Sequence, residues 1–157
     1  MQIQSSQFNA LHTRLCVCLA IALIGAAISS SAKDWPRFRG PDGAGVSADR
    51  SIPLKWGDGK NLAWKAALPG PGNSSPIVFN KRVFVTSSSG YGINKNDPGS
   101  QSNLKRHLHC FTSDTGQLLW KASVDAELPE DPYSGYLTEH GYASNTPVTD
   151  GQRASAF

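Results

Sequence analysis

The sequence predicts an all-β fold made of β-propeller blades, each of four antiparallel strands, in an incomplete propeller of about two blades. Two observations lead to this prediction. After residue 33 the apolar runs are short, are rich in β-branched and aromatic residues, and end at turn signals such as Pro69-Gly70. The phrase Leu-Ala-Trp-Lys-Ala at 62–66 also returns as Leu-Leu-Trp-Lys-Ala at 118–122. A four-stranded unit repeated at this kind of spacing is typical of propeller blades.

Residues 1–32 have the pattern of a secretory signal peptide. Arg14 supplies the positive charge, 15–28 is an unbroken apolar and small-residue run, and Ser30-Ser31-Ala32 offers a cleavage site. The run is shorter than the roughly 20 apolar residues that a membrane-spanning helix needs. We expect cleavage before Lys33, export to the periplasm or the medium, and no stable membrane span afterwards. An uncleaved membrane anchor is the alternative.

Charge and cysteine usage exclude several classes of protein. The formal net charge is +3, and the basic residues are scattered, whereas nucleic-acid binders usually carry a basic face. The longest basic cluster, at 105–107, is expected to be a solvated turn or strand end. After cleavage Cys110 is the only cysteine, so no internal disulfide framework is expected. Its apolar neighbours predict a buried, inert thiol.

Residues 33–60 are predicted to form an N-terminal extended arm. Pro and Gly recur along 34–45 at spacings that block long helices and strands. The glycines of 40–45 lack the Gly-Lys-Ser/Thr ending and the preceding strand of a phosphate-binding loop. We expect Trp35 and Phe38 to hold this arm against the rest of the domain.

Residues 61–157 are predicted to form the repeat domain, and every element in it is expected to be a strand. The first half contains strands at 62–68, 75–79 and 82–87. Asn80-Lys81 is expected to be a two-residue hairpin turn, because Asn tolerates the positive φ that such turns require. A polar insertion follows at 88–103.

The second half begins with a strand at 107–112, a turn at Asp114-Thr115-Gly116 and a strand at 117–124. Residues 144–149 and 151–154 then repeat the pattern of 73–78 and 81–84, which predicts the inner strands of a further blade. We expect Trp64 and Trp120 to pack between neighbouring blades.

The phrase at 108–121, an apolar strand followed by Asp114-Thr115-Gly116 and then Trp120, resembles the bacterial PQQ-like (quinoprotein-like) β-propeller repeat. The opening at 34–40 and the Ser74-Ser75-Pro76 strand are similar to exported members of that family. The resemblance implies a ring of seven or eight blades. At roughly 40 to 50 residues a blade, the chain holds fewer than three, so we expect a truncated N-terminal fragment or, alternatively, a partial propeller completed by another chain.

Two pairs of polar residues are candidate sites. His107 and His109 share one strand face, and they would need a third ligand to bind zinc, so we interpret them as structural histidines. Glu139 and His140 lie in a loop that the resemblance places near the central channel, together with its counterpart 72–75. A ligand- or partner-binding surface, a plain structural loop and acid–base catalysis are the alternatives there. We assign no catalytic, cofactor-binding or metal-binding residue.

We therefore expect a non-catalytic, exported β-propeller repeat protein, acting as a scaffold or as a protein- or ligand-binding module. Its partners would be other envelope proteins, contacted through blade faces or central-channel loops. The alternative that the resemblance implies is a remnant of a PQQ-dependent quinoprotein dehydrogenase. Such enzymes carry a calcium-binding set of acidic and amide residues, which the sequence does not place here, and often an adjacent cysteine pair, which it lacks.

Overall fold

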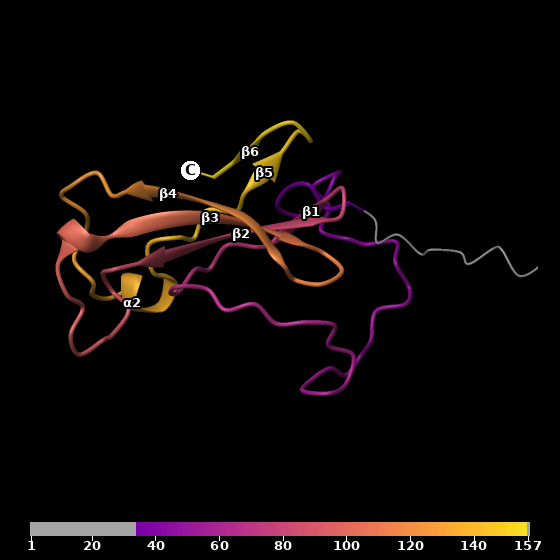
Figure 1. The fold of residues 1–157 in the computed structure, drawn as a ribbon, viewed down its shortest axis with the longest axis horizontal. Helices are drawn as coiled ribbons and strands as arrows, with labels where there is room; N and C mark the ends of the chain where they lie inside the picture. Colours follow the sequence, from indigo (N-terminus) through magenta and orange to yellow (C-terminus); the bar gives the residue numbers. More distant parts are fainter. Residues whose placement is uncertain (1–33, 157) are drawn as a thin grey trace, which may run out of the picture. The chain divides into compact units, whose positions relative to one another are not determined.

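A computed structural model describes residues 34–156, and the predicted signal peptide therefore lies outside the described residues. Strands account for 28% of the model, and helices are few. The strands β1 (Ile77–Phe79), β2 (Arg82–Ser89), β3 (Lys105–Thr112) and β4 (Leu118–Asp125) form an antiparallel sheet in sequence order (Figure 1). The all-β prediction is confirmed in the form of this sheet.

The hairpin between β1 and β2 turns at the two residues predicted from the sequence. Asn80 and Lys81 have φ angles of 47° and 59°, and Phe79 pairs with Arg82 across the turn. Two consecutive positive φ angles are the mark of a type I′ turn, which matches the twist of the flanking strands. The prediction of this turn is confirmed.

The pair of β2 and β3 is the longest in the sheet, running without a break from Arg82 opposite Thr112 to Ser89 opposite Lys105. Both strands extend two residues further than the sequence predicted. The insertion between them contains a short 3₁₀ helix, Gln101–Asn103. The sequence predicted a polar insertion, but this segment also contributes the buried side chain of Tyr91 to the core.

The turn between β3 and β4 is fixed by the backbone and by one glycine. The Thr112 amide donates to the Gln117 carbonyl at 2.9 Å, and the Gly116 amide donates to the Thr112 carbonyl at 3.0 Å. Gly116 has φ +69°, a conformation that L side chains rarely adopt. The pairing register shifts between Cys110 and Phe111, which face Trp120 and Leu118, so the extra residue of this bulge is Leu119 on β4.

Residues 62–68 do not form the predicted strand. Trp64, Ala66 and Leu68 alternate inward as a strand would require, but the segment pairs with no strand of the described chain. We call residues 64–71 the strap, because they cross the face of the sheet. Alternation alone does not make a strand when no neighbouring backbone is within reach.

Two buried clusters make up the core. One lies on the sheet and consists of Ile77, Phe84 and Cys110. The other lies beside the sheet and consists of Tyr91, Leu104 and Tyr142, with Tyr133 and Leu137 packed against it. Cys110 is fully buried, as predicted, and burial raises the pKa of its thiol.

The expectation that every element is a strand is wrong at 137–140. There the single-turn helix α2 (Leu137–His140) follows a run of loop, and Gly141, with φ 64°, ends it. The chain then continues into β5 (Val148–Thr149) and β6 (Ala154–Ser155), which pair only with each other. One helical turn is too short to show the periodicity by which helices are found in a sequence.

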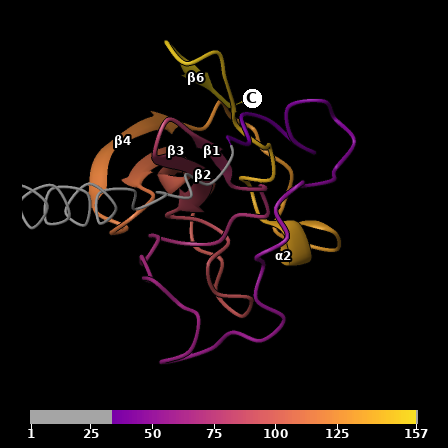
Figure 2. The same ribbon diagram turned by 90° about the vertical axis from the view of Figure 1, so that its right-hand side faces the viewer.

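The N-terminal arm is attached at one end and exposed at the other. Trp35 exchanges two backbone hydrogen bonds (2.6 and 3.0 Å) with Val78 of β1, and this part of the prediction is confirmed. Phe38 is 60% exposed, so its predicted clamping role is wrong. Residues 46–62 run away from the sheet (Figures 1 and 2). Within residues 34–156, no helix has the length and apolar character needed to cross a membrane.

Candidate functional site

A cleft of about 640 Å³ opens on one face of the sheet, between β3 and β4 and the segment 130–145. Its apolar wall includes Leu108, Ala122, Val124 and Leu137. The first three lie on one face of β3 and β4, because residues two apart on a strand point the same way, and Leu137 faces them from α2. The volume lies in the range of small-molecule sites, which are typically concave, mostly apolar and fitted with a few polar groups.

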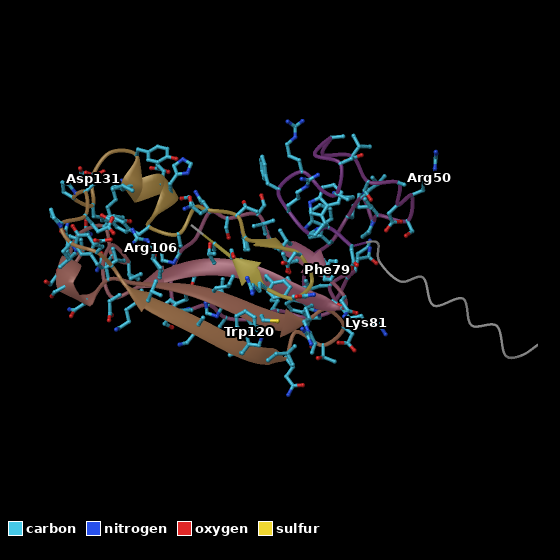
Figure 3. All side chains as sticks on the ribbon, turned by 90° about the horizontal axis from the view of Figure 1, so that it is seen from above. Arg50, Phe79, Lys81, Arg106, Trp120 and Asp131 are labelled. Atoms are coloured by element: carbon cyan, nitrogen blue, oxygen red, sulfur yellow. The ribbon has the colours of Figure 1, made fainter. Side chains whose placement is uncertain are left out.

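Arg106 connects the sheet to the far wall of this cleft. Its Nη2 lies 2.6 Å from the Glu130 carboxylate, and its Nε donates to the Tyr142 carbonyl at 2.9 Å. Figure 3 shows Arg106 and Asp131 at the α2 end of the sheet, away from Lys81. These two contacts hold the half-buried Arg106 side chain in a fixed orientation.

Tyr91, Tyr133 and Tyr142 pack together beside this far wall. The Tyr142 hydroxyl donates to the Asp131 carbonyl at 2.8 Å, and the Tyr91 hydroxyl accepts from the Tyr133 amide at 3.1 Å. Burial, reinforced by neighbouring Tyr91, raises the pKa of Tyr142, so this hydroxyl stays protonated and continues to donate. Sequence reasoning missed this cluster, whose only signal was that all four tyrosines of the chain lie outside the predicted strands.

The structure brings together the two loops that the sequence marked as counterparts, 72–75 and 139–147. The Asn73 amide donates to the Ala143 carbonyl at 3.2 Å, and the Ser75 amide donates to Thr146 Oγ1 at 3.1 Å. Gly72 leaves no room for a side chain, because a Cβ there would lie 2.5 Å from the Thr86 carbonyl oxygen. The paired loops therefore form one surface beside the cleft.

Glu139 and His140 are positioned differently from the prediction. They lie on the single-turn helix α2 and not in a loop. The His140 ring stacks on Tyr136 at 3.9 Å, and its Nδ1 lies 3.2 Å from Asn73 Nδ2. In the described chain no hydrogen bond joins Glu139 to His140. These contacts give His140 a role in fixing the loop.

His107 and His109 lie on one face of β3, as predicted, and on the side of the sheet opposite Leu108. His107 Nε2 is 2.8 Å from Ser89 Oγ, its Nδ1 is 2.8 Å from Ser123 Oγ, and His109 Nε2 is 2.9 Å from Ser87 Oγ. Residues 34–156 contain no group of three His, Cys, Asp or Glu side chains placed to hold a metal ion. We call these two histidines and three serines the serine–histidine ladder.

The pKa of both histidines lies below the ordinary value. Burial is the largest cause in each case, and Lys121 adds repulsion of the charged form. The basic cluster 105–107 lies at the end of a strand, the start of β3, which is one of the two predicted alternatives. Lys105 pairs with Asp125 and Arg106 with Glu130, so its charges do not form one patch.

Comparison with known proteins gave no match to a family model, to a curated protein or to a solved structure.

Proposed function

We propose that this chain is an exported, non-catalytic β-propeller repeat protein that acts as a scaffold or binding module. The observation that carries the proposal is the association of a four-stranded antiparallel meander with a ligand-sized cleft on one of its faces. The meander has the strand number and order of a propeller blade. The resemblance of residues 108–121 to PQQ-like repeats supports the same assignment.

The position of β5 and β6 agrees with this proposal. They follow the meander in sequence, pair with each other, and are preceded by the Asn-Thr-Pro phrase that corresponds to Ser-Ser-Pro before β1. A new unit would begin in this way. The apolar wall of the cleft and the loop surface beside it are the regions that we propose contact an envelope protein.

The binding role can be tested by photo-crosslinking in exporting cells. A benzoylphenylalanine at Val124, which is 62% exposed and lines the cleft, should give a discrete adduct with an envelope protein. The adduct should disappear when Leu137→Arg places a charge in the cleft wall. The same probe at Val46, on the exposed arm, is the matched control. Equal adducts from both positions would contradict the proposal.

The enzyme alternative, a quinoprotein remnant, has a direct assay. The acidic residues lining the cleft are Glu130 and Asp131, and Glu130 is already paired with Arg106. This set does not fit a calcium site, which takes six to eight oxygen ligands. Addition of pyrroloquinoline quinone and calcium should give no dye reduction with alcohols or sugars, and sustained turnover would overturn the non-catalytic assignment.

A further inference from the structure

The strap is anchored to the sheet at both ends. At the first end the Trp64 indole N–H donates to the Ser113 carbonyl at 2.9 Å. Its ring occupies the space that a side chain at Gly116 would need, 2.4 Å from an ideal Cβ. At the second end the Pro71 carbonyl accepts from the amide of Ser88 at 2.9 Å and from its hydroxyl at 3.2 Å. Close approach of the strap at these two points is thus built into the chain.

Between its anchors the strap does not bond to the sheet. Residues 65–70 make no backbone hydrogen bond to any other residue within 34–156. Beneath them lies a groove of about 520 Å³, on the face of the sheet that carries the serine–histidine ladder. Its apolar lining includes Ala66, Leu68, Phe111 and Leu118. A groove with apolar and aromatic lining and a few polar groups can hold a small molecule.

The polar end of this groove is formed by His109 and Lys121, which are directly opposite each other on β3 and β4. His109 is only 3% exposed, and Ser87 Oγ bonds its Nε2. Its Nδ1 has no hydrogen-bond partner in the described chain. Every fully buried side-chain nitrogen or oxygen there is bonded, so Nδ1 retains some access. Lys121 has no ion pair within residues 34–156.

The charge state of this end follows from its surroundings. Burial, followed by repulsion from His107 and Lys121, lowers the pKa of His109, so the imidazole is neutral at pH 7. When the Ser87 hydroxyl donates to Nε2, the ring proton lies on Nδ1. His109 then offers an N–H donor beside the ammonium group of Lys121, and both residues line the groove.

We propose that this groove binds a small organic carboxylate, with the anion between Lys121 and His109 Nδ1 and an aryl or branched alkyl body on Phe111 and Leu118. An anion would pair with the Lys121 ammonium group and accept from His109, and an apolar body would pack on Phe111, Leu118 and the strap. This site lies on the opposite face of the sheet from the cleft, and the proposal does not depend on the function proposed above.

Phenylacetate is a suitable probe, titrated into the full chain while tryptophan fluorescence and the His109 ring nitrogen signals are followed. Binding should be saturable, and benzylamine, which has the opposite charge on a similar body, should not bind. Lys121→Met keeps the side-chain stem and removes the charge. It should weaken phenylacetate about tenfold or more, the loss expected for a charge-assisted hydrogen bond.

Lys60→Met, on the exposed arm, is the matched control and should bind as the unaltered chain does. Binding of phenylacetate that Lys121→Met leaves unchanged, equal binding of benzylamine, or no saturation at millimolar concentrations would each overturn the proposal. If Lys121→Met fails to fold, the titration of the unaltered chain with phenylacetate still tests the proposal. A saturable shift of the His109 Nδ1 signal supports the site, and a constant signal overturns it.

Discussion

The two faces of the sheet are stabilised by different forces. On one face the core cluster of Ile77, Phe84 and Cys110 excludes water and depends on shape and apolar area. On the other face the serine–histidine ladder places two buried histidines, each hydrogen-bonded to a serine on a neighbouring strand. The first face should therefore be sensitive to lost volume, and the second to lost hydrogen-bond partners and to protons.

Ile77→Ala should give the largest loss of stability. Ile77 is fully buried in the apolar cluster, and truncation of such a side chain typically costs about 2–5 kcal/mol through lost transfer energy and the cavity left behind. Urea unfolding followed by circular dichroism measures the change. The loss should be the same at pH 8 and pH 6, since the raised pKa of the neighbouring Cys110 thiol keeps it protonated at both. A strongly pH-dependent loss would contradict this contrast between the faces.

Ser87→Ala tests the polar face and should cost about 1–3 kcal/mol, because it leaves the buried Nε2 of His109 without a partner. The double variant Ser87→Ala with His109→Phe removes both partners and should recover part of the loss. The same unfolding measurement applies to both. No recovery in the double variant would mean that the ladder stabilises by packing alone.

Acidification should destabilise the folded chain through the same face. The folded-state pKa of His107 and of His109 lies below the ordinary 6.5, first because burial disfavours the imidazolium and then because nearby positive charge repels it. The unfolded chain therefore binds more protons as the pH falls below about 6.5. The contribution is fully present above the unfolded pKa and is lost as the pH falls toward the folded pKa.

Unfolding free energies measured from pH 8 to pH 5 give this slope. In the variant His107→Gln with His109→Gln the slope over this window should become shallower. A slope unaffected by the double variant would assign the acid sensitivity elsewhere.

Leu119→Lys should have the smallest effect on monomer stability, within about 0.5 kcal/mol, because the site is exposed. It should nevertheless reduce self-association. The outer edge of β4 pairs with no strand of the described chain, and Leu118, Leu119 and Trp120 are exposed along it. Charged side chains on an edge strand oppose edge-to-edge pairing. Light scattering checks this, with Lys55→Glu on the arm as a control.

Local signals predicted the meander well. Asn80-Lys81 and Gly116 have the turn chemistry that their positions demand, and the strands between them carry β-branched and aromatic residues. The repeated phrase at 62–66 led to a wrong strand prediction, because Trp64 and Trp120 share a sequence phrase but lie in different surroundings. Trp64 is bonded to the Ser113 carbonyl from a loop, whereas Trp120 lies on a strand and packs on Phe84 at 5.9 Å.

The two pockets were less predictable, because they depend on contacts between residues far apart in the sequence. The shared face of His107 and His109 follows from strand alternation, but the serines that bond them come from β2 and β4. Arg106 meets Glu130 only because the chain folds back after β4. Contacts between residues this far apart leave no pattern in the local sequence.

The order of the strands has a consequence for how the protein folds. Each strand of the meander pairs with its neighbour in sequence, so the sheet can form from short-range contacts. The strap reaches Ser113 and the loop 139–147 reaches Asn73 only by closing long segments of chain, which is slower. We expect hydrogen exchange to show the strap and the loop opening before the sheet does, so that both cavities are exposed in partially open states of a sheet that is still intact.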